Sequence, residues 1–124
     1  MIAIICSRSS WGCWGRLVGD ALPAPDRAVL EQLAEHGDVG AIPREVTIWI
    51  YGPKADLDTV ATRLTPGWSN TSPAENEGRW RIMAHRVQEA TAEAILAMGN
   101  EVDAATAGTS AEYDCWETSI EQSN

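Results

Sequence analysis

The sequence predicts an α+β fold of the ferredoxin-like βαββαβ type, in which helices cover one face of a four-stranded antiparallel sheet and an extra N-terminal helix is added. The chain has 124 residues, the size of one domain, and its 44% hydrophobic content is enough for one compact core. From residue 26 onward, segments with strand alternation are separated by segments with helical periodicity. Their order is strand, helix, strand, strand, helix, strand, which is the split βαβ order.

The first 25 residues predict an extension that precedes a domain over residues 26–124. After the apolar run "MIAIIC", the sequence mixes Gly, Ser and Pro with Trp11 and Trp14 and shows no steady periodicity. We expect the two tryptophans to dock on the domain. The apolar run is too short for a signal peptide or a membrane span, so a cytoplasmic protein is expected.

Three later segments have the pattern of amphipathic helices. The first follows Asp26, a good N-cap, and ends at Gly37, which supplies a stop. The second starts near Pro53, a residue type that is favoured at the first helical position, and ends before a Pro-Gly pair. The third is expected over Ala90–Ala105, where apolar side chains recur at helical spacing.

Strand alternation is strongest in "REVTIWIY", Arg44–Tyr51, and in the segment Arg79–Arg86, so these two are expected as the central strands. A weak strand, "WSNTS", and a turn over Pro73–Gly78 precede the second of them. The last strand is expected in "AEYDCWETSI", Ala111–Ile120. The side chains expected to meet in the core are Val46, Ile48, Ile50, Leu57, Leu64, Ile82, Ile95 and Val102.

The alternation also predicts which side chains lie on the sheet face away from the helices. In the last strand Tyr113 and Cys115 share one face, while Asp114 and Trp116 share the other. If the first pair faces the helices, Trp116 stands on the open face. Its expected neighbours there are Trp49 and Tyr51, with Arg79, Arg81, Met83 and His85 one strand further.

The charge of the chain narrows the choice of partners. There are 18 acidic and 9 basic residues, a net charge of −9, and the segment Val87–Asn124 contains no Lys or Arg. Direct nucleic-acid binding requires clustered positive charge, so an RNA-binding sheet is disfavoured and a basic protein surface is favoured as the partner. Acidity that only keeps the protein soluble explains the same composition.

The residues that could carry catalysis or bind a metal do not form a recognisable pattern. Three cysteines, Cys6, Cys13 and Cys115, give neither a disulfide framework nor a paired metal motif, although a site made of Cys6, Cys13 and His36 can be imagined. The acidic neighbours of Cys115 disfavour a thiolate nucleophile. His36 and His85 are not spaced with a nucleophile or a phosphate loop. We therefore expect a protein that is not an enzyme and that has no cofactor and no metal.

The strand "IPREVTIWIY", the "GP" and helix that follow it, and the ending "EYDCWET" resemble the RraB family, named for a regulator of ribonuclease E activity. The resemblance runs from about Asp26 to Ile120 in the same order of elements. Cys115 stands where the family's "EYDGWE"-like ending has glycine, and no long acidic tail of the kind found in the founding protein precedes Asn124. The resemblance implies a ferredoxin-like fold and a non-catalytic inhibitor that binds ribonuclease E rather than RNA.

The expected partner-binding residues combine aromatic anchors with charged side chains, as interface centres do. They are Trp49, Tyr51, Arg81, Glu93, Glu101, Asp114, Trp116 and Glu117. The expected partner is a nuclease with a basic segment. Two alternatives stay open: an immunity-type inhibitor of another basic toxin nuclease, and a different binding module. In addition, residues 1–25 could cover the open face as a lid, and the oligomeric state is not predicted.

Overall fold

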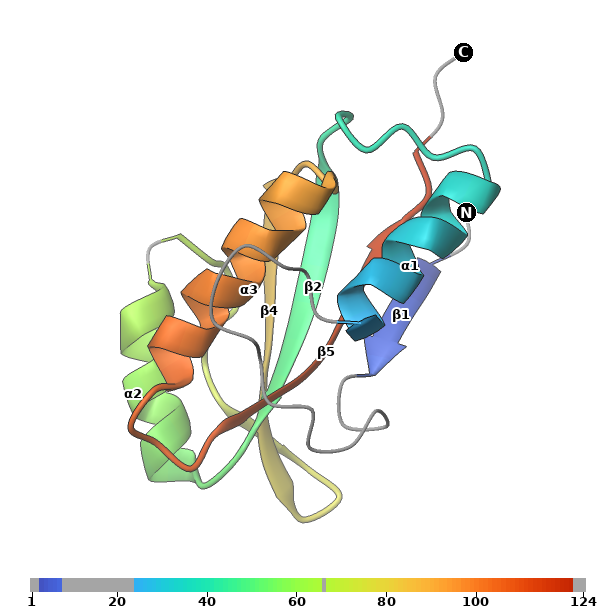
Figure 1. The fold of residues 1–124 in the computed structure, drawn as a ribbon. Helices are drawn as coiled ribbons and strands as arrows, with labels where there is room; N and C mark the ends of the chain where they lie inside the picture. The colour runs from blue at the N-terminus through green and yellow to red at the C-terminus, as the bar shows by residue number, and fades with distance from the viewer. Residues whose placement is uncertain (1–2, 8–23, 66, 122–124) are drawn as a thin grey trace.

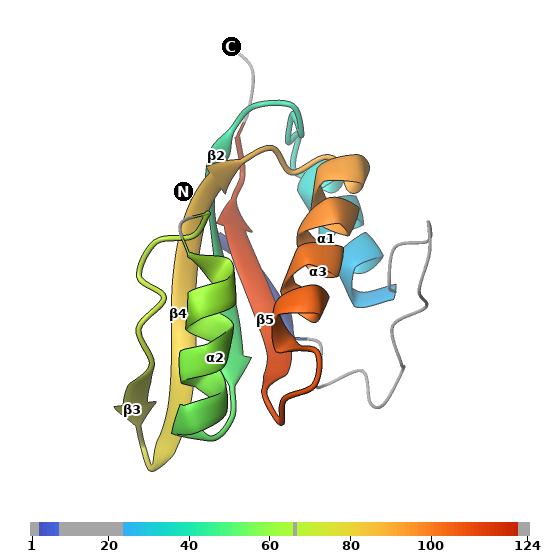
Figure 2. The ribbon, with the colours of Figure 1, turned by 90° about the vertical axis from the view of Figure 1, so that its left-hand side faces the viewer.

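The computed structural model describes residues 3–7, 24–65 and 67–121. In this part of the chain, three helices lie against one face of a five-stranded antiparallel sheet (Figures 1 and 2), which confirms the predicted fold class. The strands are β1 (Ala3–Ser7), β2 (Arg44–Tyr51), β3 (Ala74–Asn76), β4 (Arg79–Gln88) and β5 (Glu112–Ser119). The helices are α1 (Ala24–Glu35), α2 (Lys54–Leu64) and α3 (Ala92–Thr106).

The strand order across the sheet is β1-β5-β2-β4-β3, and all neighbours are antiparallel. The order β5-β2-β4-β3 is the one expected of a ferredoxin-like sheet, and neither β2 nor β4 lies at an edge, as predicted. Strand β1 is an addition beyond β5, with Ala3 opposite Ser119 and Ser7 opposite Cys115. Part of the predicted extension therefore widens the sheet. Trp11 and Trp14 lie outside the described residues.

The hairpin before β4 differs from the prediction. Strand β3 lies inside the segment that was expected to be a turn, and the connection is reduced to Glu77 and Gly78, with φ of 53° and 80°. Two consecutive residues with positive φ are typical of the tightest hairpin turns. The expected strand "WSNTS" contributes only a bridge between Ser69 and His85, because Asn70 adopts a φ of 60° that leaves the extended path.

Helix α1 begins at Ala24, so the prediction that Asp26 is its N-cap is wrong. Asp26 lies in the first turn and is buried, with 1% of its surface exposed. The predicted stop at Gly37 is confirmed. Its φ is 80°, and the helix end is closed by the two backbone hydrogen bonds that are typical of a glycine stop. The N–H of Gly37 donates to Ala34 at 3.0 Å and that of Asp38 donates to Leu33 at 3.0 Å.

The core lies between the helices and the inner side chains of the sheet. All eight side chains predicted to meet there are buried, which confirms the faces assigned to β2, β4, α2 and α3. The physical reason is that strict alternation in β2 and β4 leaves only one way to bury their aliphatic side chains. Further large core members are Val29, Leu33, Trp68, Met98 and Trp116.

We predict that Ile48→Ala lowers the free energy of unfolding by about 2–5 kcal/mol, since the side chain is fully buried on the central strand. Val87→Ala is the control, because Val87 is 67% exposed on the neighbouring strand and its truncation is expected to change stability by less than about 0.5 kcal/mol. Urea unfolding followed by circular dichroism measures both. Equal midpoints for Ile48→Ala and the unmodified protein would contradict the assignment of the core.

Candidate functional site

A β-bulge in β5 decides where the side chains of the closing motif point. Cys115 lies opposite Trp49 on β2, but the next residue of β2, Ile50, lies opposite Tyr113. Asp114 is therefore an extra residue without a partner on β2. As a result, Tyr113 and Trp116 both pair with residues of the core face, although they stand three positions apart.

The prediction that Trp116 stands on the open face is wrong. Trp116 pairs with Ile48, is 0% exposed and belongs to the core. Its indole Nε1 donates a hydrogen bond of 3.0 Å to Oδ1 of Asp26, which joins β5 to α1. Uninterrupted alternation was assumed for β5, and the bulge at Asp114 breaks it. A fully buried indole cannot serve as an anchor on the protein surface.

Glu101 is bound by other side chains of the protein. Its carboxylate accepts hydrogen bonds from Trp68 Nε1 at 3.0 Å and from Arg86 Nη1 at 2.9 Å. The guanidinium carbon of Arg86 also lies 4.1 Å from the centroid of the Trp68 ring, at cation-π distance. Glu101 thus links α3 to β4 and to the loop after α2, and a substitution there would disturb the fold as well as the surface charge.

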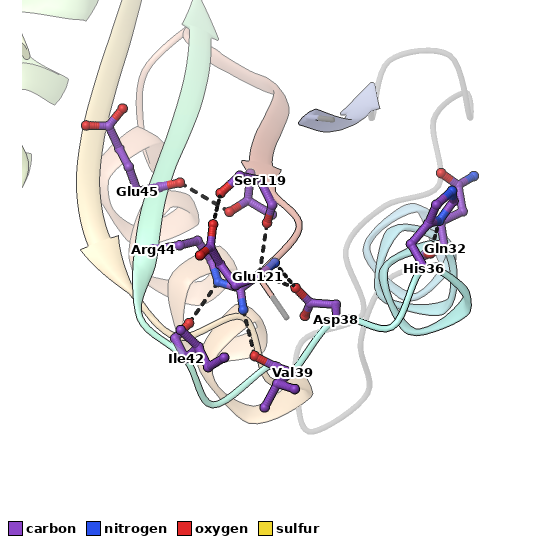
Figure 3. A network of polar contacts seen from close by, with 10 residues as sticks. Gln32, His36, Asp38, Val39, Ile42, Arg44, Glu45, Ser119 and Glu121 are labelled. Atoms are coloured by element: carbon purple, nitrogen blue, oxygen red, sulfur yellow. Dashed lines mark hydrogen bonds and ion pairs between the residues drawn. The ribbon is translucent and has the colours of Figure 1, made fainter. Parts of the chain in front are cut away.

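The loop between α1 and β2 is fixed by a buried ion pair (Figure 3). Arg44 Nη1 donates to Asp38 Oδ1 at 2.7 Å, and the two side chains are 1% and 4% exposed. Arg44 also donates to the carbonyls of Ile42, Val39 and Ser119 at 2.9, 2.8 and 3.0 Å. Asp38 Oδ1 in turn accepts from the backbone N–H of Glu121 at 2.8 Å. The loop and the end of β5 are therefore held as one unit.

The open face of the sheet is the first exterior surface of interest. No helix of the described chain covers it (Figure 2). We use the name open face for the side chains that the pairing of β2, β4 and β5 places opposite the core: Glu45, Thr47, Trp49, Tyr51, Arg79, Arg81, Met83, His85, Val87, Glu112 and Glu117. Glu45 stands where this face meets the end of the sheet at which β2 begins. The guanidinium of Arg79 lies 4.2 Å from the centroid of the Tyr51 ring. Thr47 Oγ1 and His85 Nδ1 are 3.2 Å apart, at hydrogen-bond distance.

A second surface is acidic and lies at one end of the molecule. There α1 and β5 end, β4 ends and α3 begins, and the backbone bonds Val39 to Glu121 and Ala90 to Gly40 tie these segments together. We call this surface the acidic end and define it by four exposed carboxylates, those of Glu35, Glu45, Glu89 and Glu93. Glu121 lies beside them, and its carboxylate accepts from Ser119 Oγ at 2.7 Å.

The predicted site residues therefore fall into separate places. Trp49, Tyr51, Arg81 and Glu117 lie together on the open face, and Asp114 sits at the bulge beside it. Glu93 is on the other layer, at the acidic end, while Glu101 and Trp116 hold the fold together. Sequence reasoning missed Asp26 as the partner of Trp116, because 90 residues separate them.

Among the described residues, no group of three or more His, Cys, Asp or Glu side chains comes together in a way that could hold a metal ion. The side chains of Cys6 and Cys13, which entered the imagined metal site, lie outside this description. None of the helices in the described ranges has the length and apolar character needed to span a membrane.

The chain matches the model of a known protein family. This family is RraB, described as regulator of ribonuclease activity B, and the match covers residues 24–118. The range runs from α1 through almost all of β5, and so includes the central strands, the bulge and both residues of the buried ion pair. No curated protein and no solved structure matches the chain.

We predict that Asp38→Ala lowers the free energy of unfolding by about 3–5 kcal/mol, because it leaves the buried guanidinium of Arg44 without its charged partner. Asp58→Ala is the matched control. It removes the same group from the exposed pair with Lys54, whose side chains are 55% and 52% exposed, and should cost less than about 1 kcal/mol. Chemical denaturation of both variants measures the difference. Similar small losses would show that the Arg44 pair does not hold the loop.

Proposed function

Because this chain belongs to the RraB family, whose description is regulator of ribonuclease activity, we propose that it regulates a ribonuclease by binding the enzyme directly and stoichiometrically, without turning over a substrate. The family match carries this proposal. Ribonuclease E is the target that the resemblance of the sequence motifs implies. We propose that the contact is made with a basic segment of that nuclease.

The charge distribution supports a protein partner over RNA. Several of the cations in the described residues are bound within the fold: Arg44 is buried, Arg86 binds Glu101, and Arg63 donates to the carbonyls of Ala105 and Ala107 at 3.0 and 2.7 Å. Arg79 rests on the Tyr51 ring. A sheet face that binds RNA needs clustered positive charge for the phosphates. On the open face, Arg79 and Arg81 share the sheet with the carboxylates of Glu112 and Glu117.

We place the nuclease contact at the acidic end. Glu35, Glu45, Glu89 and Glu93 are exposed there. Two cations on the adjoining strands, Arg44 of β2 and Arg86 of β4, are bound to Asp38 and Glu101. Carboxylates that are not neutralised by neighbouring cations produce a field that attracts a basic segment and raises its rate of association. The Asp38 and Arg44 bonds hold these loops in place, so little conformational freedom is lost when a partner binds.

We predict that the double variant Glu89→Lys and Glu93→Lys binds ribonuclease E with an association rate that is roughly tenfold lower at low salt. The difference should shrink as salt is added, because both carboxylates are exposed. Surface plasmon resonance over a series of salt concentrations measures the effect, and inhibition of RNA cleavage is recorded in parallel.

The control is Glu75→Lys with Glu77→Lys, which makes the same change of charge at the exposed β3–β4 hairpin, away from the acidic end. This variant should bind almost as fast as the unmodified protein. Equal slowing in both double variants would mean that net charge matters and the acidic end does not. A folded protein that neither binds nor inhibits the nuclease at equimolar amounts would contradict the proposed function itself.

A further inference from the structure

The open face carries charges of opposite sign on the two sides of its central strand. Tyr51 of β2 lies opposite Arg81 of β4 on one side and opposite Glu112 of β5 on the other. Thr47 likewise lies opposite His85 on one side and opposite Glu117 on the other. At the level of Tyr51, therefore, a guanidinium on β4 is balanced by a carboxylate on β5. At the level of Thr47, an imidazole on β4 stands across the strand from a carboxylate on β5.

From this arrangement we propose that the open face binds the open face of a second copy of the same chain. A two-fold axis that runs parallel to β2, between the two sheets, brings β4 of one copy over β5 of the other. The levels along the strand are kept by this rotation. Arg81 then meets Glu112 of the second copy, and His85 meets Glu117 of the second copy. Trp49 and Tyr51 lie near the axis and contact their own counterparts, and Glu45 faces its own counterpart at the beginning of the strand.

The charged groups are available for these contacts. Arg81, Glu112 and Glu117 are partly or fully exposed, and none of them forms an ion pair or a side-chain hydrogen bond within the described chain. Each copy supplies both members of the Arg81 and Glu112 pair, so the contact forms twice. Such reciprocity is what a two-fold interface requires.

The direction of the axis follows from the same registers. An in-plane axis perpendicular to the strands would place β4 over β4 and β5 over β5, and so would set like charges against each other. Of these two axes, the one parallel to β2 sets opposite charges against each other. It also aligns the strands of the two sheets, as is common when sheets pack face to face.

The plane of the face, roughly 500 Å² per copy, reaches the lower limit of a specific interface, which buries about 1,000 Å² in total. Strands β1, β5, β2 and β4 lie side by side. Four strands spaced about 4.8 Å apart and about eight residues long cover roughly 500 Å² of plane, and side chains in relief expose more than the plane beneath them. A standard interface buries about 800 Å² per partner. Glu35, Glu89 and Glu93 of the acidic end lie outside the strands and are left free, so a dimer presents these three carboxylates twice.

The test uses two variants with one reversed charge each, Arg81→Glu and Glu112→Arg, and sedimentation velocity over a series of concentrations. The unmodified protein should sediment with twice the monomer mass. Each variant alone sets like charges against each other in both symmetric contacts, so its dimer dissociation constant should rise roughly tenfold or more.

Mixing the two variants in equal amounts decides the question. In a mixed dimer the reversed position 81 of one chain meets the reversed position 112 of the other, so this contact again joins opposite charges. The second contact joins the native Arg81 of one chain to the native Glu112 of the other. The mixture should therefore regain the dimer that neither variant forms alone. A contact within one chain could not produce this recovery.

Glu93→Arg is the control for charge reversal outside the open face, and it should leave the dimer unchanged while weakening nuclease binding. An intact dimer together with weakened nuclease binding in this variant separates this proposal from the proposed function. The proposal is overturned if the unmodified protein is a monomer at the highest attainable concentration. It is also overturned if the mixed variants remain monomers.

Discussion

The bulge at Asp114 is the constraint on which the arrangement of surfaces depends. In a strand, successive side chains alternate between faces, so one inserted residue moves every side chain on one side of it to the opposite face. Here the insertion turns both Tyr113 and Trp116 toward the helices. The indole of Trp116 then reaches Asp26, and this buried hydrogen bond ties α1 to the closing strand. Without the bulge, one of the two aromatic rings would stand on the open face.

Buried polar contacts also explain why the acidic end is a defined surface. The connection from α1 to β2 contains no helix or strand of its own. Arg44 donates to two backbone carbonyls of this connection and to one of β5. Asp38 binds both Arg44 and the backbone N–H of Glu121. A charged pair of this kind stabilises a fold only when its remaining donors and acceptors are also satisfied. That condition is met here by backbone groups, and the segments that carry the exposed glutamates are tied to one another.

Much of the fold could be predicted, because β2 and β4 alternate strictly and their aliphatic side chains identify the core. The bulge could not be predicted from alternation, which assumes that no residue is inserted. One signal was available: Tyr113 and Trp116 are large and three positions apart, and a strand can bury both only if it is irregular. The binding of Glu101 by Trp68 and Arg86 depends on contacts between distant segments, so composition alone presented it as a free surface charge. Strand β1 is five residues long at a sheet edge, too short for a periodic signal.

The role of Trp116 as a core residue, and not as a surface anchor, is tested most directly by hydrogen exchange of the tryptophan indole N–H groups, followed by nuclear magnetic resonance. Trp116 Nε1 is buried and bonded to Asp26, whereas Trp49 lies partly exposed on the open face. The Trp116 indole proton should exchange only through global unfolding, with a free energy of opening equal to that of the most protected backbone amides. Exchange of the Trp116 proton as fast as that of Trp49 would contradict this account.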